Sequence, residues 1–176
     1  MAEKNLMEVE TRLGKQLVSL DRIIRFPRGL IGYEEKRDFA LMQIREGVPF
    51  LVLQSLEDPS FGLMVADPYS FVEDFSIKLG DTEQKMLHVE RPEQVSVLIT
   101  VTIPPGKPEE TFLNFSGPIL INHEARIGLQ IAQSDPSQPG RVFLNRPEAG
   151  KEAGKEAPKA GEQGKAQAPE GEADKD

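Results

Sequence analysis

The chain lacks cysteine and tryptophan, and it is poor in histidine, aromatic residues and positive charge. Without cysteine it can form no disulfide, thiolate metal site or cysteine nucleophile. Its two histidines, His88 and His123, lie 35 positions apart. A zinc or non-haem iron site would therefore depend almost wholly on carboxylates, which is an uncommon donor set for these metals. We expect neither a metal nor another cofactor.

The charge balance is acidic, with 21 Lys and Arg against 29 Asp and Glu among 176 residues, a net charge of −8. This balance argues against direct binding to nucleic acid, which needs clustered positive charge to displace counterions. The N-terminal region has no apolar run of signal-peptide length. No stretch approaches the roughly 20 apolar residues that span a bilayer. We therefore expect a soluble, cytoplasmic protein without a membrane partner.

The composition changes sharply at residue 147. Residues 147–176 contain no Val, Ile, Leu, Met, Phe or Tyr, and they carry eight acids and five lysines. Such a segment cannot bury enough apolar surface to offset the entropy of the chain. We predict a β-rich domain over residues 1–146 and a disordered, low-complexity acidic tail over residues 147–176. The tail could serve solubility or bind a partner.

Short apolar runs with alternating character predict strands across the first 146 residues. The clearest run is residues 95–103, in which every second residue from Val95 to Ile103 is apolar and β-branched. Residues 8–12 and 18–24 are expected to pair as a hairpin around Gly14 and Lys15. Further strands are predicted at residues 39–44, 50–54, 61–66, 111–115, 119–121 and 127–132.

Breaks between these runs have recognisable turn chemistry. Three Asp-Pro pairs, at residues 58–59, 67–68 and 135–136, place a former of Asx turns before a residue that disfavours a helix. Two Pro-x-Gly turns are predicted at residues 27–29 and 104–106. Residues 81–89 form the best helix candidate, with Asp81 or Thr82 as its cap. Short strands separated by turns, with one short helix, indicate a mainly β domain, either a closed or strongly bent barrel-like sheet or a sandwich.

No motif of an enzyme is present. The chain has no glycine-rich phosphate loop and no G-x-S-x-G nucleophile elbow. Carboxylates are abundant, so counting alone leaves a paired-carboxylate hydrolase open. Most of the acids lie in predicted turns and in the tail, where solvated charge is the ordinary explanation. We therefore expect no enzymatic activity.

Five segments in order resemble one known family, the bacterial flagellar assembly factor FliW. The first is IRFPRGLIGYE at residues 24–34, and the second is PFLVLQSLEDP at residues 49–59. The third is FGLMVADPYSFVEDF at residues 61–75. Residues 97–104 and NFSGPILINHEARIG at residues 114–128 complete the series. The resemblance covers roughly residues 5–133, nearly all of the predicted domain.

The resemblance implies a β-rich, barrel-like fold without catalysis and two cytoplasmic protein partners. One partner is newly made flagellin, and the other is CsrA, a small dimeric protein that represses translation of flagellin mRNA. Proteins similar to this chain bind CsrA away from its RNA surface and weaken its hold on RNA. Flagellin competes for the same antagonist, so its secretion relieves CsrA and restarts synthesis. The alternative is a flagellin-binding chaperone without CsrA regulation.

Aromatic side chains beside acids in a loop can supply both contact area and charge complementarity to a protein partner. On that basis one predicted contact surface is the loop with Asp67, Tyr69, Phe71, Glu73 and Asp74, with Glu57 and Asp58 beside it. Core packing is the competing interpretation for the aromatics, and solvated turns for the acids. A second predicted surface is the strand end at Asn122 and His123, where a turn hydrogen bond is the competing interpretation.

Overall fold

A computed structural model describes residues 5–12 and 14–145 of the chain. Their strands are β1 (Leu6–Thr11), β2 (Gly14–Ser19), β3 (Ile23–Arg25), β4 (Asp38–Gln43), β5 (Phe50–Ser55), β6 (Gly62–Ala66), β7 (Val95–Thr102), β8 (Phe112–Asn122), β9 (Ile127–Gln130) and β10 (Arg141–Phe143). The helix α1 spans Asp81–Met86, and 3-10 helices lie at η1 (Leu20–Arg22), η2 (Pro68–Ser70), η3 (Pro92–Gln94) and η4 (Pro108–Glu110). Among these residues no helix is long and apolar enough to cross a membrane. The predicted tail at residues 147–176 lies outside the described part of the chain.

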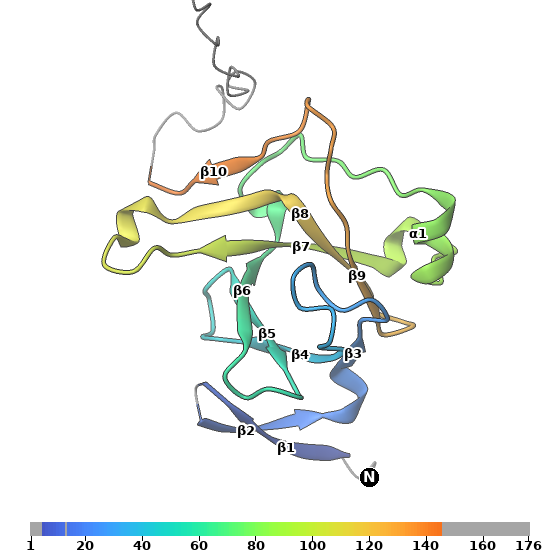
Figure 1. Cartoon of the computed structure of the whole chain (residues 1–176), viewed down its shortest axis with the longest axis vertical. Coiled ribbons are helices and arrows are strands. Elements are labelled where there is room, and N and C mark those ends of the chain that lie inside the picture. Colours follow the sequence, from blue (N-terminus) through green and yellow to red (C-terminus); the bar gives the residue numbers. More distant parts are fainter. Residues whose placement is uncertain (1–4, 13, 146–176) are drawn as a thin grey trace, which may run out of the picture.

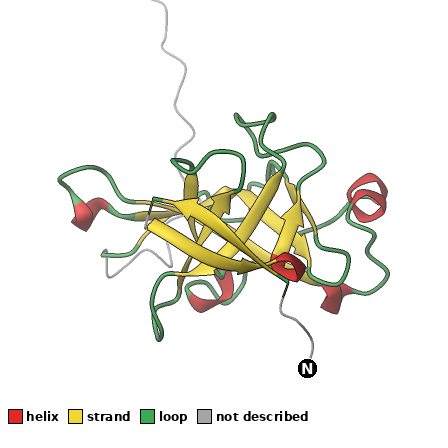
Figure 2. Ribbon diagram, turned by 90° about the horizontal axis from the view of Figure 1, so that it is seen from below, coloured by secondary structure: helices red, strands yellow, loops and turns green. Residues whose placement is uncertain are grey.

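Seven strands close into a barrel. They follow one another in the order β9-β3-β4-β5-β6-β7-β8, and β8 pairs again with β9. Neighbouring strands are antiparallel except β3 and β9, which meet in parallel at Arg25 and Ile127. Figure 2 shows the strands gathered in the centre and the helices outside them. The prediction of a mainly β, barrel-like domain with one short α-helix is confirmed.

The inside of the barrel is filled by apolar side chains from alternate strand positions, as expected for a small barrel. Phe26, Phe39, Leu53 and Val65 are among the fully buried members of this core. Gly128 of β9 faces the same interior, where a β-carbon at this position would lie 2.3 Å from the ring of Phe26. The missing side chain at Gly128 therefore makes room for Phe26.

The loop between β3 and β4 covers one end of the barrel. In Figure 1 this loop, drawn in blue, lies within the ring of barrel strands. Its Leu30 is buried, and its Tyr33 ring packs 4.2 Å from the ring of Phe61, centroid to centroid. Gly29 has φ +66°, and a β-carbon there would meet the backbone of Glu34 at 2.6 Å. Only glycine therefore fits this turn, which folds the loop back over the barrel.

Three further apolar clusters lie on the outside of the barrel. The β1–β2 hairpin packs Val9 and Val18 against Ala40 of β4. The segment after β6 packs Phe75 edge-to-face on Phe115 of β8, with 4.9 Å between the ring centroids. Leu87, which follows α1, packs with Leu120 and Leu129 of β8 and β9. The apolar face of β7 predicted from its alternation joins these outer clusters, because the loops cover it.

Several predicted boundaries were wrong. Residues 18–24 are two strands, because η1 carries the chain from the hairpin into the barrel. The runs at residues 111–115 and 119–121 form one long strand, β8, whose pairing with β7 is interrupted by a bulge. The helix ends at Met86, and Gly80 rather than Asp81 or Thr82 is its N-cap. The strand β10 was not predicted, since its three residues give no periodic signal.

All three predicted Asx turns are present. In each, a carboxylate oxygen of the aspartate accepts the backbone N–H two residues later: Ser60 to Asp58 at 3.0 Å, Tyr69 to Asp67 at 2.9 Å and Ser137 to Asp135 at 2.9 Å. Proline between the two residues holds the backbone in the turn. Two of these turns flank β6 and so fix where that strand begins and ends.

Candidate functional site

The end of the barrel opposite the β3–β4 loop is hollow. A cavity of about 630 Å³ opens there, with a floor of barrel-core side chains that includes Ile24, Leu98 and Ile121. The remaining lining residues are Asp21, Arg22, Leu41, Leu51, Asp67, Tyr69, Val95, Ser96, Val97, His123 and Arg126. We call this cavity the barrel mouth. Mouths of β-barrels are preferred places for binding because strands hold the lining side chains rigidly.

The barrel mouth brings together residues from both predicted contact surfaces. Asp67 and Tyr69 follow β6, while His123 follows β8, and all three line the cavity. The Asx turn of Asp67 caps η2 and leaves the Tyr69 side chain half exposed. The backbone N–H of His123 donates to the carbonyl of Gln94 at 3.1 Å, so the turn holds the backbone while the side chain stays exposed. The two predicted surfaces therefore meet at the barrel mouth through Asp67, Tyr69 and His123.

In the rest of the loop after β6, some side chains pack against the barrel and others are exposed to solvent. Phe71 stacks on Phe50 with 6.1 Å between the ring centroids and belongs to an outer apolar cluster. Glu73 and Asp74 are exposed, and neither has an ion pair with another described residue. The loop thus presents two exposed carboxylates, Glu73 and Asp74, and keeps the ring of Phe71 packed against the barrel.

Asn122 has a structural role. Its side chain is 1% exposed, and its amide nitrogen donates to the carbonyls of Leu87 at 2.9 Å and His88 at 3.0 Å. Its amide oxygen accepts the backbone N–H groups of Glu124 and Ala125, each at 3.0 Å. One side chain therefore joins the end of α1 to the β8–β9 turn. This supports the competing interpretation of a turn hydrogen bond at Asn122.

Glu57 and Asp58 do not lie beside the other predicted residues, and this part of the prediction was wrong. They precede β6 whereas Asp67 follows it, and its five residues separate the two loops by about 16 Å. The error arose because residues close in sequence were assumed to be close in space. An intervening strand carries them to opposite ends of the barrel.

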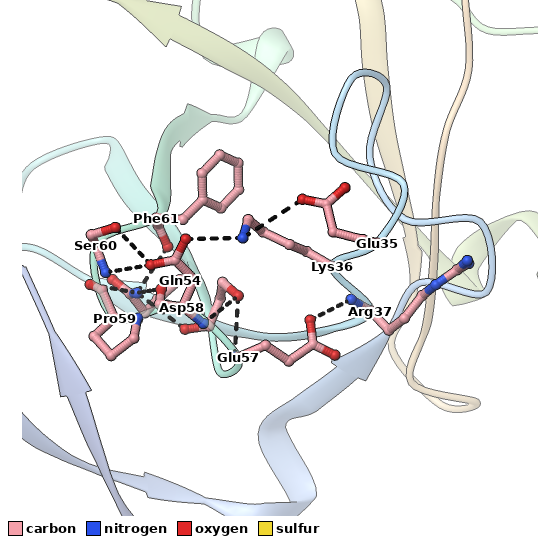
Figure 3. A network of polar contacts seen from close by, with 10 residues as sticks. Glu35, Lys36, Arg37, Gln54, Glu57, Asp58, Pro59, Ser60 and Phe61 are labelled. Carbon is pink, nitrogen blue, oxygen red and sulfur yellow. Dashed lines mark hydrogen bonds and ion pairs between the residues drawn. The ribbon is translucent and has the colours of Figure 1, made fainter.

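At the closed end, Asp58 belongs to the polar network of Figure 3. Lys36 donates to its carboxylate at 2.9 Å, and the Ser60 hydroxyl donates at 2.6 Å. These two bonds lower the pKa of Asp58 from 3.8 to about 2, and the bond from the Ser60 hydroxyl makes the larger contribution. Glu57 accepts the backbone N–H of Arg37 at 2.8 Å. Both carboxylates therefore tie the β5–β6 loop to the β3–β4 loop.

Sequence reasoning missed two arginines of the mouth, Arg22 and Arg126. They come from η1 and from the turn before β9, 104 positions apart, and no local pattern marks either one. The parallel pairing of β3 with β9 brings them together. Both lie near Asp21, whose pKa is lowered first by the Ser19 hydroxyl and then, among other contributions, by the charges of these arginines. Neither arginine forms an ion pair within 4.0 Å among the described residues.

The side chains that line the barrel mouth are suited to contacts with another protein. Within residues 5–12 and 14–145, no three His, Asp or Glu side chains are grouped so that they could hold a metal ion. Its lining combines an apolar floor with an exposed tyrosine, two arginines and two aspartates. Tyrosine and arginine around an apolar pocket are typical of the residues that dominate protein–protein binding energy.

Comparison with known proteins identifies the family. Residues 8–144 match the family described as FliW protein. The chain belongs to the FliW family. A flagellar assembly factor FliW from Nitratidesulfovibrio vulgaris is 58% identical over 149 residues, which cover 85% of this chain and 86% of that protein. One from Desulfovibrio desulfuricans is 44% identical over 147 residues, which cover 82% and 88%.

The fold agrees with that of a solved FliW. A crystal structure of the flagellar assembly factor FliW aligns with a TM-score of 0.71 and 24% sequence identity. The alignment covers 81% of this chain and 99% of the other. The seven-stranded barrel is therefore a fold that this FliW chain shares with a solved member at low sequence identity.

Proposed function

We propose that this chain is a non-enzymatic factor of flagellum biogenesis that acts in the cytoplasm by binding two proteins in turn. It binds the translational regulator CsrA and weakens the hold of CsrA on flagellin mRNA. It also binds flagellin as a chaperone, and flagellin bound to it is exchanged for CsrA when flagellin is secreted. Membership of the FliW family over nearly the whole described part of the chain is the observation that carries the proposal.

The barrel mouth supports a role in protein binding. An apolar floor with a rim of exposed aromatic and charged side chains can bury an anchor residue of a partner and select its flanking charges. The net charge of −8 suits a partner that binds RNA through basic residues, because opposite charges speed diffusional encounter. We therefore propose Asp67, Tyr69 and His123 as contacts, with Glu73 and Asp74 at the edge of the site.

Regulation at a distance needs only a modest coupling energy. If this chain binds CsrA away from the RNA surface, a coupling of about 1–3 kcal/mol between the two CsrA sites weakens RNA binding about 5- to 150-fold. By the same linkage, RNA weakens the binding of this chain to CsrA by the same factor. Neither step requires this acidic chain to touch RNA.

The test is a titration of labelled flagellin leader RNA with CsrA in the presence and absence of this chain, followed by fluorescence anisotropy. We expect the chain to raise the dissociation constant of CsrA for RNA and to give no signal with RNA alone. Adding flagellin should restore the affinity of CsrA for RNA. An RNA affinity unchanged at a saturating concentration of the chain would refute the CsrA role. If the chain bound flagellin but did not change the affinity of CsrA for RNA, its function would be that of a flagellin chaperone without CsrA regulation.

A further inference from the structure

The barrel mouth continues on both sides into smaller hollows. One lies between the β1–β2 hairpin and β4, has a volume of about 460 Å³ and shares Asp21, Arg22 and Leu41 with the mouth. The other lies toward α1, has a volume of about 380 Å³ and shares Tyr69, Val95 and Val97 with the mouth. Together they form a trough across the open end of the barrel. Three adjoining hollows that share lining residues are suited to a polypeptide segment more than to a compact small molecule.

The two sides of the trough differ in charge. Arg22 and Arg126 precede β3 and β9, and Asp21 lines the mouth beside them. Asp67 follows β6, three strands further around the ring from β3, and lines the mouth on that side. The hollow toward α1 adds one acid and one base, Glu90 and Arg91. The mouth therefore has two arginines on one side and Asp67 on the other, with an apolar floor between them.

Residues 147–176 of this chain do not match the trough. They contain no large aliphatic or aromatic side chain that could enter the apolar floor. The last described residue, Asn145, follows β10, and β10 pairs with the Phe112 end of β8. The trough lies at the other end of β8, next to Asn122 and His123. Residues 147–176 therefore cannot supply an apolar side chain to the floor, and an occupant that does so belongs to another polypeptide molecule.

We infer that the trough binds one amphipathic segment of the protein partner, lying across the barrel mouth in a fixed direction. An apolar side chain of that segment enters the mouth above Ile24, Leu98 and Ile121. A carboxylate on one side of the anchor pairs with Arg22 and Arg126. A cationic side chain on the other side faces Asp67. This inference rests on the proposed function, since it says how a partner of the family is held.

Ser96 gives the sharpest test of the apolar anchor. It is exposed, lies on β7 and lines the mouth, so Ser96→Trp fills the entrance from a position where a bulky residue fits a strand. The matched control is Thr102→Trp, which is also exposed on β7 but lies outside the mouth. Circular dichroism and thermal melting establish that both variants fold. Calorimetric titration with purified CsrA and, separately, with flagellin measures binding.

The charge pattern is tested by reversing the two arginines. Arg22→Glu with Arg126→Glu removes the cationic side, and Arg28→Glu with Lys107→Glu changes the net charge equally at exposed positions elsewhere. We expect the first double variant to lose at least tenfold in affinity for CsrA or for flagellin. The second double variant should lose less than threefold. Equal losses in both would show that net charge alone acts, and the pairing with a carboxylate would be refuted.

The outcomes separate this inference from the proposed function. A tenfold or larger loss of affinity in Ser96→Trp, with Thr102→Trp unchanged, supports the trough as the binding site. Unchanged binding of both CsrA and flagellin by Ser96→Trp overturns the trough but leaves the proposed function intact. If the unaltered chain binds neither protein, the proposed function fails and the trough inference fails with it.

Discussion

Replacing Asn122 by alanine should destabilise the fold strongly. The substitution removes four hydrogen bonds that join α1 to the β8–β9 turn. The bond to the Leu87 carbonyl is fully buried, and a buried group left without a partner costs about 1–3 kcal/mol. The other three bonds are partly buried, so water replaces them in part. We expect a loss of about 2–4 kcal/mol in the free energy of unfolding.

Thermal and denaturant unfolding measure this loss. At about 4 °C per kcal/mol for a domain of this size, Asn122→Ala should lower Tm by roughly 8–16 °C. The matched control is Asn114→Ala on the same strand, where the half-buried side chain accepts one N–H, that of Ser116 at 3.1 Å. That control should cost less than about 1 kcal/mol, the net value of one ordinary hydrogen bond.

A second substitution separates the donated from the accepted bonds. Asn122→Asp keeps the two accepted N–H bonds but directs a carboxylate oxygen at the carbonyls of Leu87 and His88. It should be at least as destabilising as alanine at pH 7 and recover part of its stability in acid, where the protonated form can donate. An unchanged Tm in Asn122→Ala, together with weakened partner binding, would refute the structural role and make Asn122 a contact.

Three further predictions follow from other parts of the molecule. Gly128→Ala places a methyl group against the Phe26 ring and should cost about 1–3 kcal/mol or more, because the barrel interior cannot expand; an unchanged denaturation midpoint would contradict this packing. The folded-state pKa of Asp58, about 2, lies below its ordinary value of 3.8, so its stabilisation is complete above pH 4–5 and is lost as pH falls toward 2. Asp58→Asn should therefore show a weaker fall in Tm between pH 5 and pH 2 than the unaltered chain, and parallel curves would oppose the assignment. Removal of residues 147–176 should leave Tm unchanged, because that segment has no large apolar side chain to bury, and a large drop would overturn the predicted boundary.

Local chemistry in the sequence was sufficient to predict much of the fold. Alternating β-branched residues predicted β7, and each Asp-Pro pair predicted an Asx turn that the structure contains. These features depend on neighbours within a few residues, so they can be read from the chain directly. The same holds for the glycine turn at Gly29, where a positive φ is required.

Features that depend on distant contacts were harder to predict. Two separate strands were predicted at residues 111–115 and 119–121, and Pro118 between them cannot donate in a ladder. The chain nevertheless runs on as β8, because residues 131 and 133 donate to the carbonyls of Pro118 and Ser116 in place of the interrupted pairing with β7. A segment that lies 13 or more residues away thus keeps the strand continuous.

The candidate site shows the same division. Tyr69, Asp67 and His123 could be proposed from the sequence because aromatic and polar residues at strand ends are locally visible, and all three line the mouth. The barrel closes through the pairing of β3 with β9. This closure places the three residues around one cavity and adds Arg22 and Arg126 to its lining. Glu57 and Asp58 were grouped with them wrongly, because only the register of β5 and β6 reveals that they lie at the other end.

We propose that this member of the FliW family regulates RNA binding by CsrA without contacting RNA. The deciding measurement is the dissociation constant of CsrA for flagellin leader RNA at increasing concentrations of this chain. We expect a rise that saturates at about 5- to 150-fold, as for coupling between two separate sites. The proposal would be refuted if the dissociation constant of CsrA for RNA did not change at a saturating concentration of this chain. It would also be refuted if this chain alone bound RNA.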